Sequence, residues 1–326
     1  MEDLENKKYW IWFSLIKGLG CVRKNNLLKI YGTPEEIYKL SKRELLKVDR
    51  IGEETVTNII EAKNEKILNY HIKYMEENNI DIIHICEKSY PQALKQIYDA
   101  PASLYIRGNK EILNGKNIGI VGCRECTDYG KKAAKYFAYN LSKEKSVNIV
   151  SGLAKGVDSY AHWGSVGANI ECENTKNCGK KQESCGKINN NCGKINDDCG
   201  KLKNDCGKTI AVLGNGLNMI YSKENIELAN EIIRSGGAII SEYPCGTKPD
   251  KMNFPARNRI ISGLSIGIIV IEAKEKSGTL ITVDFALEQG RDVFVVPGNI
   301  NSINSVGTND LIKQGAKMVT SYEDIK

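Results

Sequence analysis

Residues 251–264 combine side chains that could hold an anion. The stretch reads KMNFPARNRIISGL. Pro255 is expected to end the preceding segment, and the apolar residues after it recur at helical spacing. We therefore expect a helix whose first turn contains Arg257, Asn258 and Arg259. Such a turn offers unpaired backbone N–H groups, and guanidinium groups match phosphate oxygens, so the pattern favours phosphate binding.

Two residues just before this helix fit the same chemistry. Lys251 adds a positive charge, and the ring of Phe254 could stack on an unpaired base. The alternative is structural: Phe254 and the isoleucines would belong to the core, and the arginines would pair with carboxylates. Each residue alone fits either interpretation, and their combination at one helix start favours an anion site.

The middle and end of the chain alternate apolar strands with helices. Continuous Val/Ile runs between helices predict an α/β fold, a Rossmann-like, doubly wound and mainly parallel sheet covered on both faces. The expected strands are residues 117–121, 147–150, 209–213, 238–241, 267–271 and 292–296.

The carboxyl ends of parallel strands share one edge of a sheet, and ligands bind outside it. Glycine turns close several strands, and small residues there let backbone amides approach an anion. Glycine also ends strands for steric reasons alone. The candidate phosphate-binding residues in these turns are Gly122, Arg124, Ser151, Gly152, Lys155, Ser277, Gly278 and Thr279.

Residues 1–79 are predicted to form a small all-α domain before the sheet domain of residues 80–326. Apolar stripes break at Gly18-Leu19-Gly20 and again at residues 50–52. A glycine-apolar-glycine break before a helix resembles the helix-hairpin-helix, whose loop amides can meet a DNA phosphate. Helix caps use glycine as well, so the structural interpretation stays open.

A low-complexity insertion at about residues 171–206 interrupts the alternation. Cys-Gly-Lys recurs there every seven residues, and six of the eleven cysteines fall within it. Recurrent glycine opposes a helix by about 1 kcal/mol per residue, so we expect a flexible loop. The segment has no histidine and no Cys-x-x-Cys, which argues against zinc and leaves a soft-metal or redox role as a minor alternative. The other cysteines are typical of a reduced compartment.

Composition limits the other functions. The net charge of +6 is modest, so a nucleic-acid site must be a local patch. Residues 1–9 lack the apolar region of a secretory signal and residues 266–271 are too few to span a membrane, so we expect a cytoplasmic protein without a membrane partner.

Catalytic and cofactor motifs are not apparent. The first strand is not followed by G-x-G-x-x-G, and H-E-x-x-H does not occur. His162 fits a core position, and the pair Cys123 and Cys126 fits coincidence better than redox chemistry. We therefore expect no cofactor, no metal and no catalytic residue.

Several stretches together resemble the DNA-processing protein A family (DprA, also called Smf), which bacteria use in natural transformation. The resemblance implies a helical domain before an extended Rossmann-like domain that binds single-stranded DNA, forms a homodimer and helps load the recombinase RecA. It places the basic pocket on Arg124, Lys155, Lys251 and Phe254. The matching stretches are residues 90–91, 101–108, 119–130, 151–162, 208–225 and 237–316.

Some features depart from the family pattern. Cys123 stands where the family usually has Ser or Thr, the insertion follows the helix of His162, and the chain ends before the winged helix of some members. Rossmann-like enzymes that hydrolyse nucleotides have a glutamate soon after the equivalent of Thr279, where this chain has Leu280. Nucleotide binding or hydrolysis in the same crevice is thus the alternative to DNA binding.

Overall fold

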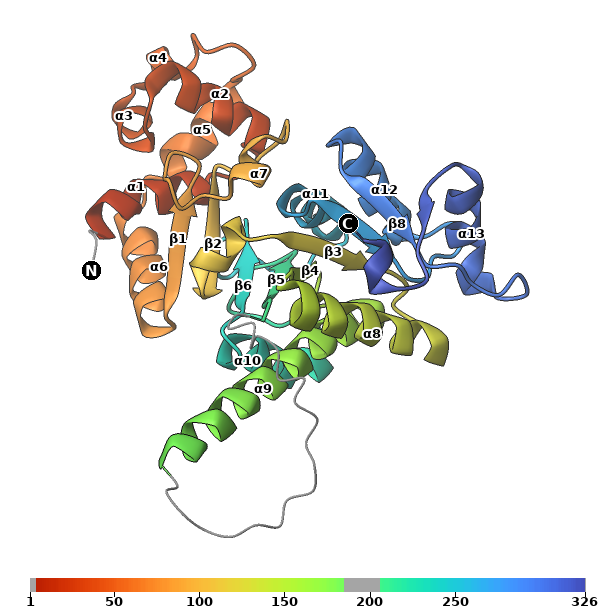
Figure 1. Ribbon diagram of the computed structural model, residues 1–326. Coiled ribbons are helices and arrows are strands. Elements are labelled where there is room, and N and C mark those ends of the chain that lie inside the picture. The colour runs from red at the N-terminus through yellow and green to blue at the C-terminus, as the bar shows by residue number, and fades with distance from the viewer. Residues whose placement is uncertain (1–3, 185–205, 326) are drawn as a thin grey trace, which may run out of the picture.

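The computed structural model describes residues 4–184 and 206–325, and within them one mixed sheet organises the molecule (Figure 1). The strand order is β1-β2-β6-β5-β4-β3-β7-β8-β9. The strands are β1 (Ile80–His84), β2 (Ser103–Gly108), β3 (Asn117–Val121), β4 (Asn148–Ser151), β5 (Thr209–Leu213), β6 (Ala238–Ser241), β7 (Gly267–Val270), β8 (Asp292–Val295) and β9 (Lys317–Met318).

The sheet is parallel from β6 to β9 and antiparallel at β1 and β2. The six predicted strands are present within one residue of their expected ends, whereas β1 and β9 were not anticipated. The chain runs outward in one direction from β3 to β6 and in the other from β7 to β9. The strand order therefore reverses between β3 and β7, which is where an open α/β sheet forms its ligand crevice.

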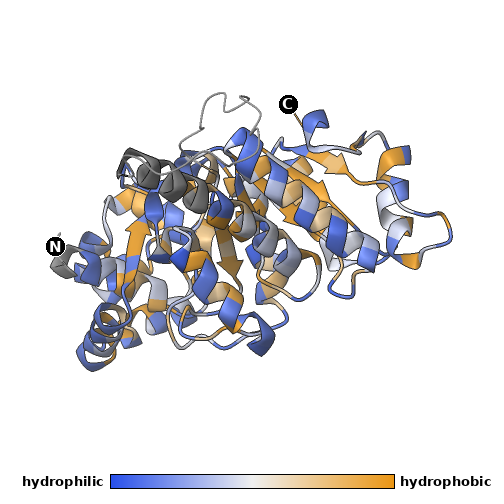
Figure 2. Cartoon of the chain, turned by 60° about the horizontal axis from the view of Figure 1, so that its bottom comes forward, coloured by the Kyte–Doolittle hydropathy of each residue, from blue (hydrophilic) through white to orange (hydrophobic). Residues whose placement is uncertain are grey.

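Helices cover both faces of the sheet, and the strands between them are strongly apolar (Figure 2). Apolar clusters place α8 and α9 on one face and α11 and α12 on the other. The α-helices that follow β1 along the chain are α7 (Gln92–Lys95), α8 (Asp128–Lys145), α9 (Val157–Ser184), α10 (Ile226–Arg234), α11 (Asn253–Leu264), α12 (Gly278–Glu288) and α13 (Val306–Lys313). Short 3-10 turns are η1 (Lys110–Asn114), η2 (Lys223–Asn225), η3 (Ile303–Ser305) and η4 (Tyr322–Asp324).

The N-terminal helices pack directly on the sheet. Ser41 and Glu44 form a capping box at the start of the helix Lys42–Leu45, and Asn64 caps the helix Glu65–Glu77. These caps explain where the two helices begin. Trp12 and Phe13 share one buried apolar cluster with α10 and with β1, β2, β5 and β6. The helices are α1 (Leu4–Leu15), α2 (Cys21–Tyr31), α3 (Pro34–Lys39), α4 (Lys42–Leu45), α5 (Glu53–Glu61) and α6 (Glu65–Glu77).

The first part of the low-complexity segment is helical, whereas a flexible loop was expected there. Helix α9 continues to Ser184, through the first Cys-Gly-Lys repeat. The half of the helix up to Asn169 is anchored by packing against α8, and lengthening an existing helix avoids the cost of nucleating one. The lower free-energy cost of extending a formed helix therefore offsets the unfavourable helix propensity of the glycine in the first repeat. The repeats that begin at residues 185, 192 and 199 lie outside the described part of the chain, and the last, residues 206–208, directly precedes β5.

A disulfide that the sequence did not predict joins two cysteines of the low-complexity segment. Cys172 on α9 and Cys206 before β5 are joined, with their Cα atoms 6.8 Å apart. Asn169 Nδ2 also donates to the carbonyl oxygen of Gly207 at 2.9 Å, a second link between the two ends of the segment. The free thiols are those of Cys21, Cys86, Cys123, Cys126 and Cys245.

Within residues 4–184 and 206–325, no helix combines the length and apolar character required to cross a bilayer.

We predict that His162 makes stability depend on pH. The ring is fully buried, and Thr209, whose hydroxyl donates to the Ile149 carbonyl, accepts a hydrogen bond from Nδ1 at 2.6 Å. Burial, with a smaller contribution from the Arg257 charge, lowers the pKa of His162 to about 3. Because the unfolded chain takes up this proton below pH 6.5 and the folded chain does not, stability should fall by about 1.4 kcal/mol per pH unit as pH falls from about 6.5 toward 3.

Urea unfolding of the wild type and of His162→Gln between pH 7.5 and 4.5 measures this contribution. The stability of the wild type should fall more steeply with acid than that of the variant. Parallel pH dependence of the two proteins would contradict the assignment.

Candidate nucleic-acid interface

Two adjoining cavities open at the carboxyl end of the parallel strands. The larger, of about 640 Å³, is lined by residues 122–125 after β3, residues 276–279 after β7 and part of α11. The smaller, of about 480 Å³, is lined by residues 152–155, 213–215 and 220–224. Together they occupy the point where the strand order reverses, the position at which open α/β sheets bind ligands.

An arginine and two aromatic rings form the wall that the cavities share. The guanidinium carbon of Arg124 lies 5.5 Å from the ring centroid of Phe254, and the ring of Tyr221 lies 5.3 Å away on an inclined plane. A Cβ atom at Gly214 would lie 2.9 Å from Phe254 Cδ1, so glycine there leaves room for the ring. Arg124 and Tyr221 are exposed, and the wall thus presents a cation beside aromatic surface.

Lysines surround the larger cavity. The exposed Lys251 lines it together with Lys274 and Lys276. Sequence reasoning missed Lys274 and Lys276, although both lie in the turn that supplies Ser277. Lys274 is 3.4 Å from the exposed Glu125, a contact that solvent screens and that leaves the lysine free to exchange partners.

The loop after β4 brings backbone close to the smaller cavity. Leu153 adopts a left-handed conformation with φ of 56°, a strained state that proteins concentrate at ligand-binding turns. Lys155 extends from this loop and meets Glu224 at 2.5 Å, with both side chains more than half exposed. Gly152 lines the cavity. The buried hydroxyl of Ser151 instead donates to the Ile120 carbonyl at 2.6 Å and so links β4 to β3.

Arg257 forms the floor between the two cavities. Its side chain is buried, and Nη1 donates to the carbonyl oxygen of Val212 at the end of β5. Burial lowers the pKa of Arg257 to about 10, opposed by the negative charge of Asp158, so the group stays charged at neutral pH. A Cβ atom at Gly152 would collide with this guanidinium and lie 2.6 Å from Asp158 Oδ2. Glycine is therefore required where the loop crosses the buried charges.

The start of α12 completes the larger cavity. Ser277 caps the helix by accepting from the backbone N–H of Thr279 at 3.2 Å, and its hydroxyl donates to Thr279 Oγ1 at 3.0 Å. Gly278 is exposed at this turn, and Asn258 reaches it from α11. Gly122 lies opposite, where a Cβ atom would lie 2.7 Å from a methyl group of Val157.

Helix α11 begins two residues before Pro255, not after it as predicted. Proline fits the first turn because its missing N–H would have no partner there. Arg257 and Arg259 consequently lie in the second turn. They are two residues apart, about 200° around the helix, so their side chains leave in nearly opposite directions.

Arg259 points away from the crevice toward the N-terminal helices. Its Nη1 and Nη2 atoms donate to the two oxygens of Glu242 at 2.8 and 2.7 Å, and Nε lies 2.8 Å from Asp99 Oδ2. Burial alone would raise the pKa of Glu242, but the Arg259 charge holds it below its usual value. Cys21 of α2 also contacts this guanidinium at 3.2 Å. The structural alternative, a paired arginine, thus describes Arg259.

The structure brings most of the candidate residues into the crevice. Ser151 and Arg259 lie outside both cavities, and Tyr221, Lys274 and Lys276 join the group. The larger cavity contains Gly122, Arg124, Lys251, Phe254, Arg257, Asn258, Ser277, Gly278 and Thr279; the smaller contains Arg124, Gly152, Lys155, Phe254 and Arg257.

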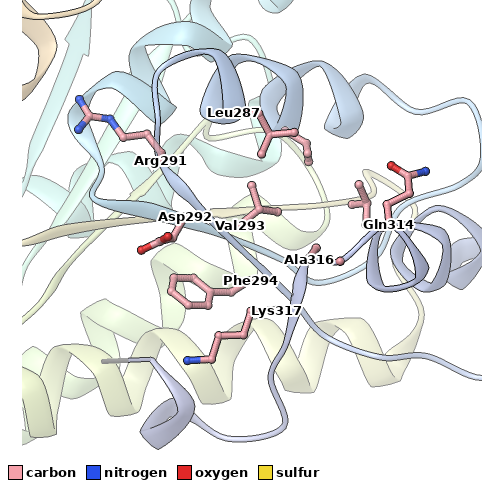
Figure 3. A pocket seen from close by; sticks show the side chains of 11 residues that line it. Leu287, Arg291, Asp292, Val293, Phe294, Gln314, Ala316 and Lys317 are labelled. Atoms are coloured by element: carbon pink, nitrogen blue, oxygen red, sulfur yellow. The ribbon is translucent and has the colours of Figure 1, made fainter.

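A separate hollow of about 540 Å³ lies at the β9 edge, between the end of α12, β8 and α13 (Figure 3). Lys317 extends over the ring of Phe294, 5.5 Å from its centroid, and Leu287 lines the opposite side. The hollow contains none of the candidate residues. In the part of the chain that the structure describes, no three His, Cys, Asp or Glu side chains are grouped as a metal ion would require.

These features define a class: an extended Rossmann-like protein with a basic, aromatic crevice at the strand-order reversal. The chain belongs to the family described as DNA recombination-mediator protein A, whose sequence pattern matches residues 81–179 and 200–326. Residues 14–64 match the SAM-like helix-hairpin-helix tandem.

Relatives and solved structures agree with this assignment. The chain is 39% identical to DNA processing protein DprA of Bacillus subtilis, over 85% of this chain and 80% of the relative, and 35% identical to that of Streptococcus pneumoniae, over 90% and 97%. The X-ray structure of the Streptococcus pneumoniae protein superposes with a TM-score of 0.76 at 32% identity, covering 98% and 96% of the two chains. A Helicobacter pylori DNA processing protein A, whose structure concerns its single-stranded DNA binding mode, gives 0.57 at 26% identity, covering 76% and 93%.

The paired arrangement of Arg259 predicts a loss of stability when the pair is broken. Arg259→Gln leaves the Glu242 carboxylate buried and unpaired, which should lower the free energy of unfolding by about 3–5 kcal/mol. The double variant Arg259→Gln with Glu242→Gln should recover part of that loss, because it removes the unpaired charge. Chemical unfolding of the three proteins tests this, and a stable Arg259→Gln protein would contradict the assignment.

Proposed function

We propose that this protein binds single-stranded DNA in the crevice and acts as a non-enzymatic recombination mediator. The observation that carries the proposal is the shared wall, where Arg124 stacks on Phe254 beside exposed Tyr221. Cations bind the phosphate backbone of a single strand, and aromatic rings accept its unpaired bases at about 1–3 kcal/mol per base. A duplex buries its base faces and would leave the rings unused.

The carboxylates near the cavities favour binding over catalysis. Asp158 faces the buried Arg257 guanidinium, Glu125 lies by Lys274, and Glu224 lies by Lys155. Hydrolysis of a glycosidic bond needs an acid placed toward the sugar, and Leu280 stands near the position where related hydrolases have it. A small nucleotide as the physiological ligand remains the alternative that the experiment below separates from DNA.

We propose a wider role, which family membership supports. As a DNA recombination-mediator protein A, the chain would protect incoming single strands and help load RecA during transformation or recombination, working as a homodimer. The hollow at the β9 edge is lined by residues from the end of α12, away from the start of that helix at the crevice. A protein partner at that edge would leave the crevice open for DNA.

Fluorescence anisotropy with a labelled single strand tests this function. Arg124→Ala should weaken binding roughly tenfold and reduce the slope of log K against log salt by about one, because one phosphate contact is lost. Phe254→Ala should weaken binding by about 1–3 kcal/mol with little change in slope, because stacking is not ionic. Lys317→Ala, in the separate hollow, serves as the control and should bind normally.

Competition with duplex DNA and with mononucleotides completes the test. The proposal expects duplex and mononucleotides to compete poorly. Binding unaffected by Arg124→Ala and Phe254→Ala would remove DNA from this crevice, and strong competition by a mononucleotide would favour the small-ligand alternative.

A further inference from the structure

The adjoining surfaces of α8 and α9 lead away from the crevice. Helix α8 begins just after the loop that carries Arg124, and α9 begins just after the loop of residues 152–156. The two helices lie side by side along much of their length (Figure 1). The surface of their first turns therefore continues the rim of the DNA site proposed above.

The two loops touch at Gly156, which makes that surface continuous. Gly156 has φ of 82°, and a Cβ atom there would collide with the carbonyl oxygens of Cys123 and Arg124. The backbone N–H of Tyr160 donates to the Gly156 carbonyl at 3.1 Å, so Tyr160 lies one helical turn beyond the contact. Its partly exposed side chain is the next large one along α9 from the crevice.

Two lysines of α8 converge on this tyrosine. The Nζ atoms of Lys131 and Lys135 lie 6.0 and 5.3 Å from the ring centroid of Tyr160. Their spacing of four residues places them one above the other on the same helix face. Cation–π attraction holds both ammonium groups extended over the ring. The lysines thus form a preorganised pair of positive charges over Tyr160.

Nearby acids leave most of this charge unneutralised in the first turns of α8. Lys131 meets Asp128 at 2.8 Å, but that carboxylate is 87% exposed, so the contact is weak and exchangeable. Among the described residues, no carboxylate lies within 4 Å of Lys135 Nζ. Farther along the same face, Lys143 is paired with Glu171 at 2.8 Å and also contacts Tyr139. On this face of α8, the lysines that have no paired acid among the described residues, or only the 87% exposed Asp128, therefore lie in the first turns.

We propose that single-stranded DNA leaving the crevice past Arg124 crosses Gly156 and places its next phosphate against Lys131 and Lys135. The inference rests on the proposed function, because it extends the same bound strand. Within the described residues the Tyr160 hydroxyl makes no hydrogen bond, and it stands ready to donate to that phosphate. The lysines add affinity only when the strand is long enough to reach beyond the crevice.

Charge reversal at matched positions tests this path. Lys135→Glu is compared with Lys132→Glu, an exposed lysine of the same helix about 100° around the axis from Lys131 and about 60° from Lys135. Lys131 and Lys135 lie over the Tyr160 ring, and Lys132 is not part of that pair. Both changes alter net charge equally, so their difference isolates the contact from general electrostatics. Affinity is measured by anisotropy for poly(dT) strands of increasing length, and thermal melting confirms that both variants are folded.

The Lys135→Glu and Lys132→Glu variants should have equal affinity for the shortest strand that binds. For long strands, the affinity of Lys135→Glu should be roughly tenfold lower than that of Lys132→Glu, and its slope of log K against log salt lower by about one. Equal affinities of the two variants at every length, or an equal loss by Lys135→Glu for short and long strands, would overturn the path. Failure of the wild type to bind strands of any length would instead overturn the proposed function and this extension with it, and is recognisable because the short strand fails too.

Discussion

The buried charge of Arg257 is the constraint on which the crevice depends. Its guanidinium lies under the loop of Gly152, donates to the end of β5 and faces Asp158 at the start of α9. A buried cation needs an opposite charge and hydrogen-bond acceptors close by, because water cannot reach it. Helix α11, helix α9 and two strand ends are consequently fixed against one another. Arg124 and the aromatic rings of the crevice wall line the same cavities as Arg257.

Helix α11 also ties the crevice to the N-terminal helices. Arg257 leaves one side of the helix for the crevice floor, and Arg259 leaves the other side for Glu242 and Asp99. Cys21 at the start of α2, next to the first glycine hairpin, contacts the same guanidinium. That hairpin therefore docks on the sheet domain. The two arginines, which share one short motif, hold separate parts of the molecule together.

The sequence was most informative where a physical rule acts locally. Apolar runs such as residues 117–121 could only be covered strands, and glycine turns after them located the crevice edge, so the fold, Arg124 and Phe254 were accessible. The direction of Arg259 was not accessible, because its carboxylate partners come from distant segments. The length of α9 was missed because helix propensity considers only the glycines of the repeat. It does not include the smaller cost of extending a helix that is already formed. Strand β9 is too short to carry a pattern.

Hydrogen–deuterium exchange of the protein with and without a single-stranded oligonucleotide tests the central claim most directly, because it reports where the strand lies without altering a residue. The account predicts slower exchange in residues 122–127, 152–156 and 276–282 and around Phe254, with residues 311–318 at the β9 edge unchanged. Protection confined to the β9 edge or to the N-terminal hairpins, with these crevice loops unaffected, would contradict it.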